Sequence, residues 1–200
     1  MTDAKKLVLA SSNAGKLAEL QAMLDGRGIE VLPQSAFDVP DAPETAPTFV
    51  ENALIKARHV AGATGLPALA DDSGLCVDAL DGAPGVHSAR YAGEHGNDEA
   101  NNAKLLSALS GLDPNQREAH FHCTVVLVRH AEDPDPAIAQ GRWAGRILDI
   151  PRGEGGFGYD PLFWVPAESA SAAELAPEHK NHVSHRGQAM RALLTLLGSA

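Results

Sequence analysis

Apolar and polar positions along this chain alternate in segments typical of an α/β protein. A short apolar run at residues 7–10 predicts a buried strand, and the spacing of apolar residues over about 16–24 predicts a helix after a polar turn. Residues 31–32 predict a second strand. Residues 68–70 predict a third strand, which we expect to end at two aspartates.

A helix start is marked clearly at Thr48. Glu51 follows three residues later, which is the pattern of a capping box. The stretch before it, residues 38–47, holds three prolines and is expected to be irregular. The helix is predicted to bury an apolar stripe made of Ala53, Ala57, Val60 and Ala61.

The second half of the chain predicts a hairpin between two helices. Residues 97–99 open a helix that we expect Gly111 to close, and alternation over 121–128 predicts a strand. Residues 137–150 are expected to return as its antiparallel partner, and 184–197 form the last helix. Strands that alternate with helices around an embedded hairpin predict an α/β fold with a mixed sheet.

Composition restricts the classes of function. The 200 residues are 44% hydrophobic and 21% charged, which suits one domain spanning 1–200, and no apolar run is long enough to span a membrane. The two cysteines are too few for a disulfide framework and favour a reduced, cytoplasmic protein. A net charge of −10 argues against binding nucleic acid or an anionic membrane. A phosphorylated ligand would need a local group of basic residues, a metal ion, or both.

The most informative stretch is Asp71–Leu75, in which two carboxylates follow the third apolar run. Buried carboxylates are costly to desolvate, so Asp71 and Asp72 are candidates for holding a divalent metal or activating water. The alternative is a turn in which the aspartates bond the backbone.

Other polar residues gain weight only in combination. Lys16 would lie at a helix N-terminus, where anions bind, although the segment is not a P-loop. Asn52 and Lys56 are four apart and share a helix face, which either faces a polar cleft or, more commonly for such pairs, solvent. Glu44 is a carboxylate in the proline-rich loop that could reach a metal.

The last candidates lie in the C-terminal third. Residues 155–161 combine three glycines with two aromatic residues, which suits either close approach to a flat base or a tight turn with core aromatics. Zinc ligation by His179, His182 and His185 is conceivable, but no cysteine accompanies them. His185 and Arg186 oppose the dipole of the last helix, which suggests an anionic or electron-rich ligand. The remaining histidines are interpreted as structural: His59, His87, His95, His120, His122 and His130.

Six motifs in this order resemble the inosine/xanthosine triphosphate pyrophosphatases, which remove deaminated purine nucleotides. The resemblance covers nearly the whole chain, and one departure is Ala46–Pro47, where the family usually has a glycine and a variable residue. The motifs are Ser11–Lys16, Glu44–Thr45 with Thr48–Ala53, Ala70–Leu75, Pro84–Tyr91, Phe157–Pro161 and Ser184–Arg186.

The resemblance implies an elongated α/β fold of two lobes around a long mixed sheet, with the active-site cleft between the lobes. It also implies a homodimer, dependence on Mg²⁺, and hydrolysis of ITP, dITP or XTP to the monophosphate and pyrophosphate. Glu44 and Asp72 would hold Mg²⁺, and Asp72 would accept the proton of the attacking water. The implied triphosphate contacts are Ser11, Ser12, Asn13, Ala14, Gly15, Lys16, Asn52, Lys56 and Lys180. Ser73 would touch the substrate, and the base would lie among Phe157, Gly158, Tyr159, Asp160, His185 and Arg186.

Two other classes of function remain open from sequence. The first is a nucleotide-binding regulator without catalysis, which the paired carboxylates disfavour. The second is a metal-binding module built on the C-terminal histidines, which the acidic centre of the chain disfavours.

Overall fold

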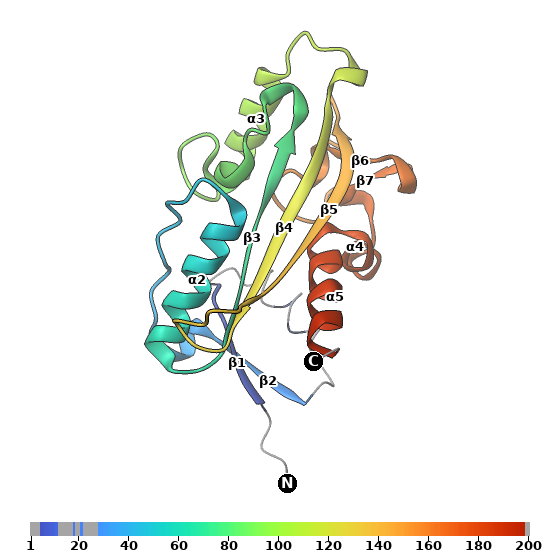
Figure 1. The fold of residues 1–200 in the computed structure, drawn as a ribbon. Coiled ribbons are helices and arrows are strands. Elements are labelled where there is room, and N and C mark those ends of the chain that lie inside the picture. Colours follow the sequence, from blue (N-terminus) through green and yellow to red (C-terminus); the bar gives the residue numbers. More distant parts are fainter. Residues whose placement is uncertain (1–4, 12–17, 19–20, 22–27, 199–200) are drawn as a thin grey trace. The chain divides into compact units, whose positions relative to one another are not determined.

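The computed structural model describes residues 5–11, 18, 21 and 28–198 (Figure 1). Its seven-stranded sheet has the order β2-β1-β3-β4-β5-β6-β7. β1 pairs in parallel with β2 and β3, whereas β6 pairs antiparallel with β5 and β7, so the sheet is mixed as predicted. The strands are β1 (Lys5–Leu9), β2 (Ile29–Pro33), β3 (Ala68–Val77), β4 (Glu118–Val128), β5 (Ala137–Ile147), β6 (Phe163–Val165) and β7 (Ala170–Ser171).

The predicted helix start at Thr48 is confirmed, with Thr48 as its N-cap. The Thr48 hydroxyl accepts a hydrogen bond from the Glu51 backbone N–H, and the helix ends at Gly65, whose φ of +67° is in the left-handed region. The predicted apolar stripe is buried. The α-helices are α2 (Phe49–Thr64), α3 (Asp98–Ala108), α4 (Pro177–Val183) and α5 (His185–Gly198). The helix predicted over about 16–24 lies largely outside the described residues.

The prediction that the third strand ends at the aspartates is wrong. β3 continues for ten residues, so Asp71 and Asp72 lie inside a strand and not in a turn. The described part of β1 pairs with β3 only at Ala68 and Leu69, while β4 neighbours β3 on its other side. β3 therefore carries its two carboxylates beyond the end of β1.

Two compact units divide the chain, and each has its own core. Unit 1 comprises 1–72, 124–140 and 189–200, and unit 2 comprises 73–123 and 141–188. In unit 1, Ala68 and Ala70 of β3 pack with α2 and with Val126 of β4, and Figure 1 shows α2 running alongside β3. In unit 2, Leu75 of β3 packs in a separate cluster with α3 and β5 residues. β3, β4 and β5 thus each contribute residues to both units.

The hairpin prediction is confirmed, because β4 and β5 are neighbours that run in opposite directions (Figure 1). β5 ends at Ile147, three residues earlier than expected. The short strands β6 and β7 and the helix α4 were not predicted, because segments of two to seven residues carry too little periodicity to be recognised. No helix among the described residues is long and apolar enough to cross a membrane.

Candidate active site

Asp72 is the carboxylate of β3 that meets the polar side chains of α2. Its Oδ1 lies 2.9 Å from Lys56 Nζ, and its Oδ2 accepts a hydrogen bond from Asn52 Nδ2 at 3.4 Å. Consecutive side chains of a strand point to opposite faces, so Asp71 cannot share this position. Only 5% of Asp72 is exposed. Asp72 is therefore the aspartate that accepts hydrogen bonds from Lys56 and Asn52, while the negative charge of Asp71 also acts on Lys56.

Lys56 joins Asp72 to the proline-rich loop. Its Nζ also lies 2.8 Å from Glu44 Oε1, so one ammonium group bridges two carboxylates. Burial lowers the pKa of Lys56, but the negative charges of Asp72, Asp71 and Glu44 outweigh that effect, and the net pKa is raised. Lys56 therefore remains a cation at neutral pH. We call Glu44, Asn52, Lys56 and Asp72 the carboxylate cluster.

Asn52 is fully buried, which corrects the interpretation of its helix face as solvated. Its Oδ1 accepts a hydrogen bond from the Ala46 backbone N–H at 2.9 Å, and its Nδ2 donates to the Ala46 carbonyl at 3.2 Å. One amide therefore satisfies both backbone groups of a loop residue. It fixes the loop that carries Glu44 to the helix that carries Lys56.

The carboxylate cluster suits a hard divalent cation in the type of its donors. Glu44 and Asp72 already share one cation, the Lys56 ammonium, and carboxylate oxygens are the ligands that Mg²⁺ prefers. Among the described residues there is no group of three or more Asp, Glu, His or Cys side chains arranged to hold a metal. Mg²⁺ is commonly held by only one or two carboxylates, with substrate phosphates and water completing its shell. The two carboxylates fit that mode of binding.

A second polar group lies in unit 2, on the glycine-rich loop. Asp160 is buried, and its Oδ2 accepts hydrogen bonds from the Phe157 backbone N–H and from Lys180 Nζ, at 2.8 and 2.6 Å. A Cβ at Gly156, whose φ is +77°, would lie 2.2 Å from the same Oδ2. Gly156 is therefore required for the loop to fold over the Asp160 carboxylate.

The two aromatic residues of this loop have different environments. Tyr159 is buried, its hydroxyl donates to the Ser88 carbonyl at 2.8 Å, and burial raises its pKa. Phe157 is 44% exposed, with Lys180 Nζ 4.9 Å and the Arg186 guanidinium 5.8 Å from its ring centre. Phe157 is therefore the ring available to stack on a flat ligand, whereas Tyr159 anchors the loop.

Sequence reasoning missed the aromatic residues that hold His185. Its ring stacks on Phe121 with centroids 4.8 Å apart and planes 11° from parallel, and Trp143 lies beyond at 6.4 Å. Both belong to the core cluster of unit 2. Alternation placed Phe121 in a predicted strand, but nothing in the sequence linked it to a histidine 64 positions away.

Arg186 and Ser73 meet at the start of unit 2. Arg186 Nη2 donates to Ser73 Oγ at 3.3 Å, and Ser73 is bonded through its backbone to Asp72 of unit 1. The Ser184 hydroxyl accepts from the Gly187 N–H, as expected of the residue before α5. We call Ser73, Phe157, Asp160, Lys180, His185 and Arg186 the loop cluster.

The other predicted positions are placed as follows. Ser11 follows β1 and is partly buried, whereas Ser12, Asn13, Ala14, Gly15 and Lys16 lie outside the described residues. His179 accepts or donates a hydrogen bond with Glu168 at 2.7 Å, and His185 is stacked in the core, so these histidines do not converge on a zinc site. Two further residues that sequence reasoning missed, Asp98 and Asn102, contact Gly158.

The protein has an α/β fold in which the long strand β3 carries a buried carboxylate paired with a lysine, and a loop of unit 2 carries an exposed aromatic ring. The chain belongs to the Ham1 family, whose model matches residues 7–196. It is 60% identical over 195 residues to a dITP/XTP pyrophosphatase of Aromatoleum aromaticum, which covers 98% of both chains. It is 56% identical to the Vibrio cholerae serotype O1 protein of the same name, over 94% of both chains.

The fold matches solved members of the family. The structure of a HAM1 protein from Coxiella burnetii aligns with a TM-score of 0.93 and 53% identity, covering 98% of this chain and all of that one. The predicted α/β fold with a mixed sheet is thereby confirmed. The resemblance to the inosine/xanthosine triphosphate pyrophosphatases is also confirmed by the names of the relatives.

Proposed function

We propose that this protein is a nucleoside-triphosphate pyrophosphatase that hydrolyses non-standard purine nucleotides, ITP, dITP and XTP, to the monophosphate and pyrophosphate. The observation that carries the proposal is the buried Asp72 carboxylate, held by Lys56 and Asn52 in a chain whose relatives are named for this activity. A carboxylate fixed beside a cation can serve both as a base and as a ligand of a metal.

The carboxylate cluster acts on the triphosphate. Asp72 accepts a proton from a water whose oxygen bonds to the α-phosphorus, while the bond from that phosphorus to the α–β bridging oxygen breaks. Pyrophosphate leaves with the bridging oxygen. Mg²⁺, held by Glu44 and Asp72, supplies charge neutralisation when it is bound. Lys56 offers a fixed positive charge that needs no reorganisation as negative charge moves to the leaving group.

The N-terminal residues complete the phosphate site in this proposal. Ser11, Ser12, Asn13, Ala14, Gly15 and Lys16 grip the triphosphate, with the assistance of Lys180. The sequence predicts backbone N–H groups and Lys16 at a helix N-terminus in this segment, and such a terminus suits this role.

The loop cluster recognises the base. Phe157 offers an exposed ring face, and Arg186 and His185 lie within the same unit. Hypoxanthine and xanthine carry a carbonyl acceptor at C6, whereas adenine carries an amino donor. Arg186 is always a hydrogen-bond donor, and a buried donor that faces adenine loses its partner at a cost of about 1–3 kcal/mol. This mismatch favours ITP and XTP over ATP.

The same proposal includes a cytoplasmic homodimer. The two cysteines, Cys76 and Cys123, are not joined in a disulfide, as expected in a reducing compartment. The dimer rests on the resemblance to the family. Sedimentation at micromolar concentration should give about twice the 20.9 kDa of one chain, and a single-chain mass would contradict it.

The decisive experiment is a panel of ITP, dITP, XTP, GTP and ATP with Mg²⁺, in which pyrophosphate and orthophosphate are measured separately. We expect pyrophosphate from the first three substrates and little product without metal. In ¹⁸O-labelled water the label should enter the nucleoside monophosphate, because water attacks the α-phosphorus. Orthophosphate as product, or label in pyrophosphate, would contradict the mechanism. Tight nucleotide binding without hydrolysis would indicate a regulator.

A further inference from the structure

Both backbone polar groups of Gly158 form hydrogen bonds with side chains of α3. The Gly158 N–H donates to Asp98 Oδ2 at 2.7 Å, and the Gly158 carbonyl accepts from Asn102 Nδ2 at 2.9 Å. Asp98 and Asn102 are four residues apart, so they lie one turn apart on the same helix face. Two side chains of one helix thereby hold the two adjacent peptide groups that flank the Gly158 Cα, in the loop that carries Phe157.

Packing alone does not hold Gly158. Its φ of +62° is in the left-handed region, and no heavy atom lies within 4 Å of the position that a Cβ would occupy. The two hydrogen bonds therefore set the orientation of the peptide groups on either side of the Gly158 Cα. On either side, Phe157 N–H bonds to Asp160, and the Tyr159 hydroxyl bonds to Ser88. The exposed Phe157 ring therefore belongs to a loop in which the next residue, Gly158, is hydrogen-bonded to α3.

α3 is a firm support for this purpose. Asn97 caps it by accepting a hydrogen bond from the Ala100 N–H, and Leu105 and Leu109 are fully buried in the unit 2 core. A hydrogen bond to an ionised carboxylate is stronger than one between neutral groups. The Asp98 contact is therefore the stronger of the two that α3 makes with the loop.

We propose that Asp98 and Asn102 are positioning residues for purine recognition, which act by holding Gly158 so that Phe157 is presented to the base. This inference rests on the proposed function. It assigns to α3 a part in substrate selection although neither side chain needs to touch the substrate. Loss of either contact should weaken base binding more than it slows the chemical step, because the carboxylate cluster is unchanged.

The test compares Asp98→Ala and Asn102→Ala with Glu99→Ala, by measuring kcat and KM for ITP and ATP. Glu99 is the adjacent exposed acid in the same first turn, so its removal controls for lost charge at the helix N-terminus. We expect KM for ITP to rise about tenfold in the first two variants, from the loss of one hydrogen bond, with kcat nearly unchanged. The preference for ITP over ATP should narrow. Asp98→Asn keeps an acceptor oxygen and should restore most of the loss.

A second measurement detects the contact directly. The Gly158 amide should exchange with deuterated solvent faster in Asp98→Ala than in Glu99→Ala, while the core amides of α3 stay protected. If both α3 variants match Glu99→Ala in KM, substrate preference and amide exchange, the inference is wrong. If the parent protein releases no pyrophosphate from ITP or XTP, the proposed function fails instead. Normal kinetics with faster Gly158 exchange would limit α3 to a structural role and overturn the inference.

Discussion

Asp71 and Asp72 are identical neighbours, yet the strand that carries them gives each a different environment. Because β3 is extended through both, only Asp72 meets Lys56 and Asn52. The sequence could predict that this pair of carboxylates matters, since two buried acids need a reason. The residues alone left the roles of the two open, and the resemblance to the family pointed to Asp72 as the base. That role stays a prediction, and the contacts of Asp72 with Lys56 and Asn52 support it.

Asp72→Asn should reduce kcat by about 10²–10⁴-fold, because the amide keeps the shape of the side chain but cannot accept the proton. The fold should persist, since the amide oxygen can still accept from Lys56, which makes the shorter of the two contacts to Asp72. Steady-state pyrophosphate release at saturating Mg²⁺ measures the loss, and thermal unfolding checks the fold. Glu132→Gln, which neutralises an exposed acid in the same unit, is the matched control. If Asp72→Asn turns over at nearly the parental rate, Asp72 is not the base, and Asp71 is the next candidate.

At the scale of elements, α2 shows what a local sequence signal can and cannot give. The start of α2 follows from Thr48 and Glu51, and its apolar stripe follows from the spacing of its apolar residues. Both signals are local, because capping and periodicity act over a few residues. The environment of Asn52 does not follow, since it is set by a loop and a strand that pack on the helix. A polar pair on a helix face is usually solvated, and here burial in the carboxylate cluster overrides that tendency.

Asn52→Ala should loosen the loop that carries Glu44. Both backbone groups of Ala46 lose their partner, so the free energy of unfolding should fall by about 1–3 kcal/mol. The Mg²⁺ concentration for half-maximal activity should also rise, because Glu44 is no longer fixed near Asp72. Denaturant unfolding and a Mg²⁺ titration measure the two effects. Glu132→Gln, at an exposed acid of the same unit, should change neither. If the Mg²⁺ dependence of activity is unchanged in Asn52→Ala, the position of this loop does not determine Mg²⁺ binding.

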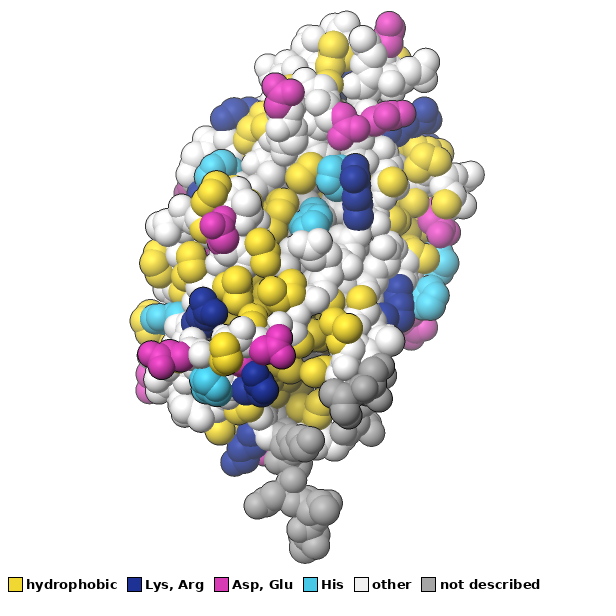
Figure 2. All heavy atoms as spheres, in the orientation of Figure 1, with side chains coloured by type: hydrophobic (Ala, Val, Ile, Leu, Met, Phe, Trp, Pro, Cys, Tyr) yellow, Lys and Arg dark blue, Asp and Glu magenta, His cyan; other side chains and the backbone are white. Residues whose placement is uncertain are grey.

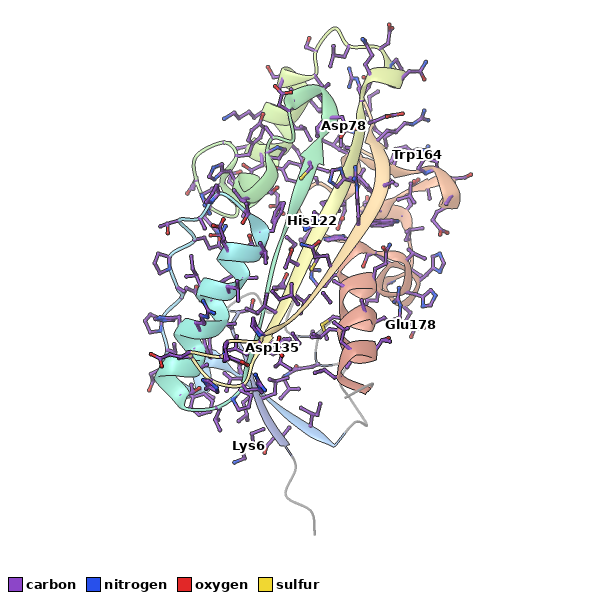
Figure 3. All side chains as sticks on the ribbon, viewed as in Figure 1. Lys6, Asp78, His122, Asp135, Trp164 and Glu178 are labelled. Carbon is purple, nitrogen blue, oxygen red and sulfur yellow. The ribbon has the colours of Figure 1, made fainter. Side chains whose placement is uncertain are left out.

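β4 carries two of the histidines that sequence reasoning left as structural, His120 and His122. Figure 2 shows histidine side chains gathered beside a basic side chain over the middle strands, and Figure 3 labels His122 on β4. Burial lowers the pKa of His122, and the positive charge of Arg142 lowers it further. The pKa of His120 is lowered too, by burial and then by Arg142, whose Nη2 lies 3.0 Å from His120 Nδ1. Both shifts favour the neutral imidazole in the folded protein.

In His122→Gln, the free energy of unfolding should fall less between pH 8.0 and pH 5.5 than it does in the parent protein. Below the ordinary histidine pKa of about 6.5 the unfolded chain binds a proton that the folded chain rejects, so the free energy of unfolding falls as pH drops through that range. Glutamine cannot titrate and removes this contribution. Urea unfolding at pH 8.0 and at pH 5.5 gives the comparison, and titrations common to both proteins cancel. Equal differences between the two pH values in parent and variant would show that His122 titrates normally.

At the scale of the whole molecule, the sheet shares strands between two cores. β3 gives Ala68 and Ala70 to the unit 1 core and Leu75 and Val77 to the unit 2 core, so side chains of opposite parity are buried along one strand. The same change explains why β4 is buried at consecutive positions near its middle. Alternation in the sequence predicted the strands but not the two cores. Odd and even positions identify the two faces of a strand, but they do not say which part of the protein covers each face.

Val126→Ala tests whether the shared strands make the two units unfold together. Val126 is fully buried in the unit 1 core, and its truncation should cost about 2 kcal/mol. The two tryptophans, Trp143 and Trp164, both lie in unit 2. Neither unit can unfold alone without disrupting strands that contribute to the core of the other, so one cooperative transition is expected. Tryptophan fluorescence should therefore shift to the same lower urea midpoint as far-ultraviolet circular dichroism, at fixed protein concentration. Val77→Ala, the matched truncation in unit 2, should shift both signals equally as well. A fluorescence midpoint that stays at the parental value in Val126→Ala, while circular dichroism separates into two steps, would show that the units unfold independently despite their shared strands.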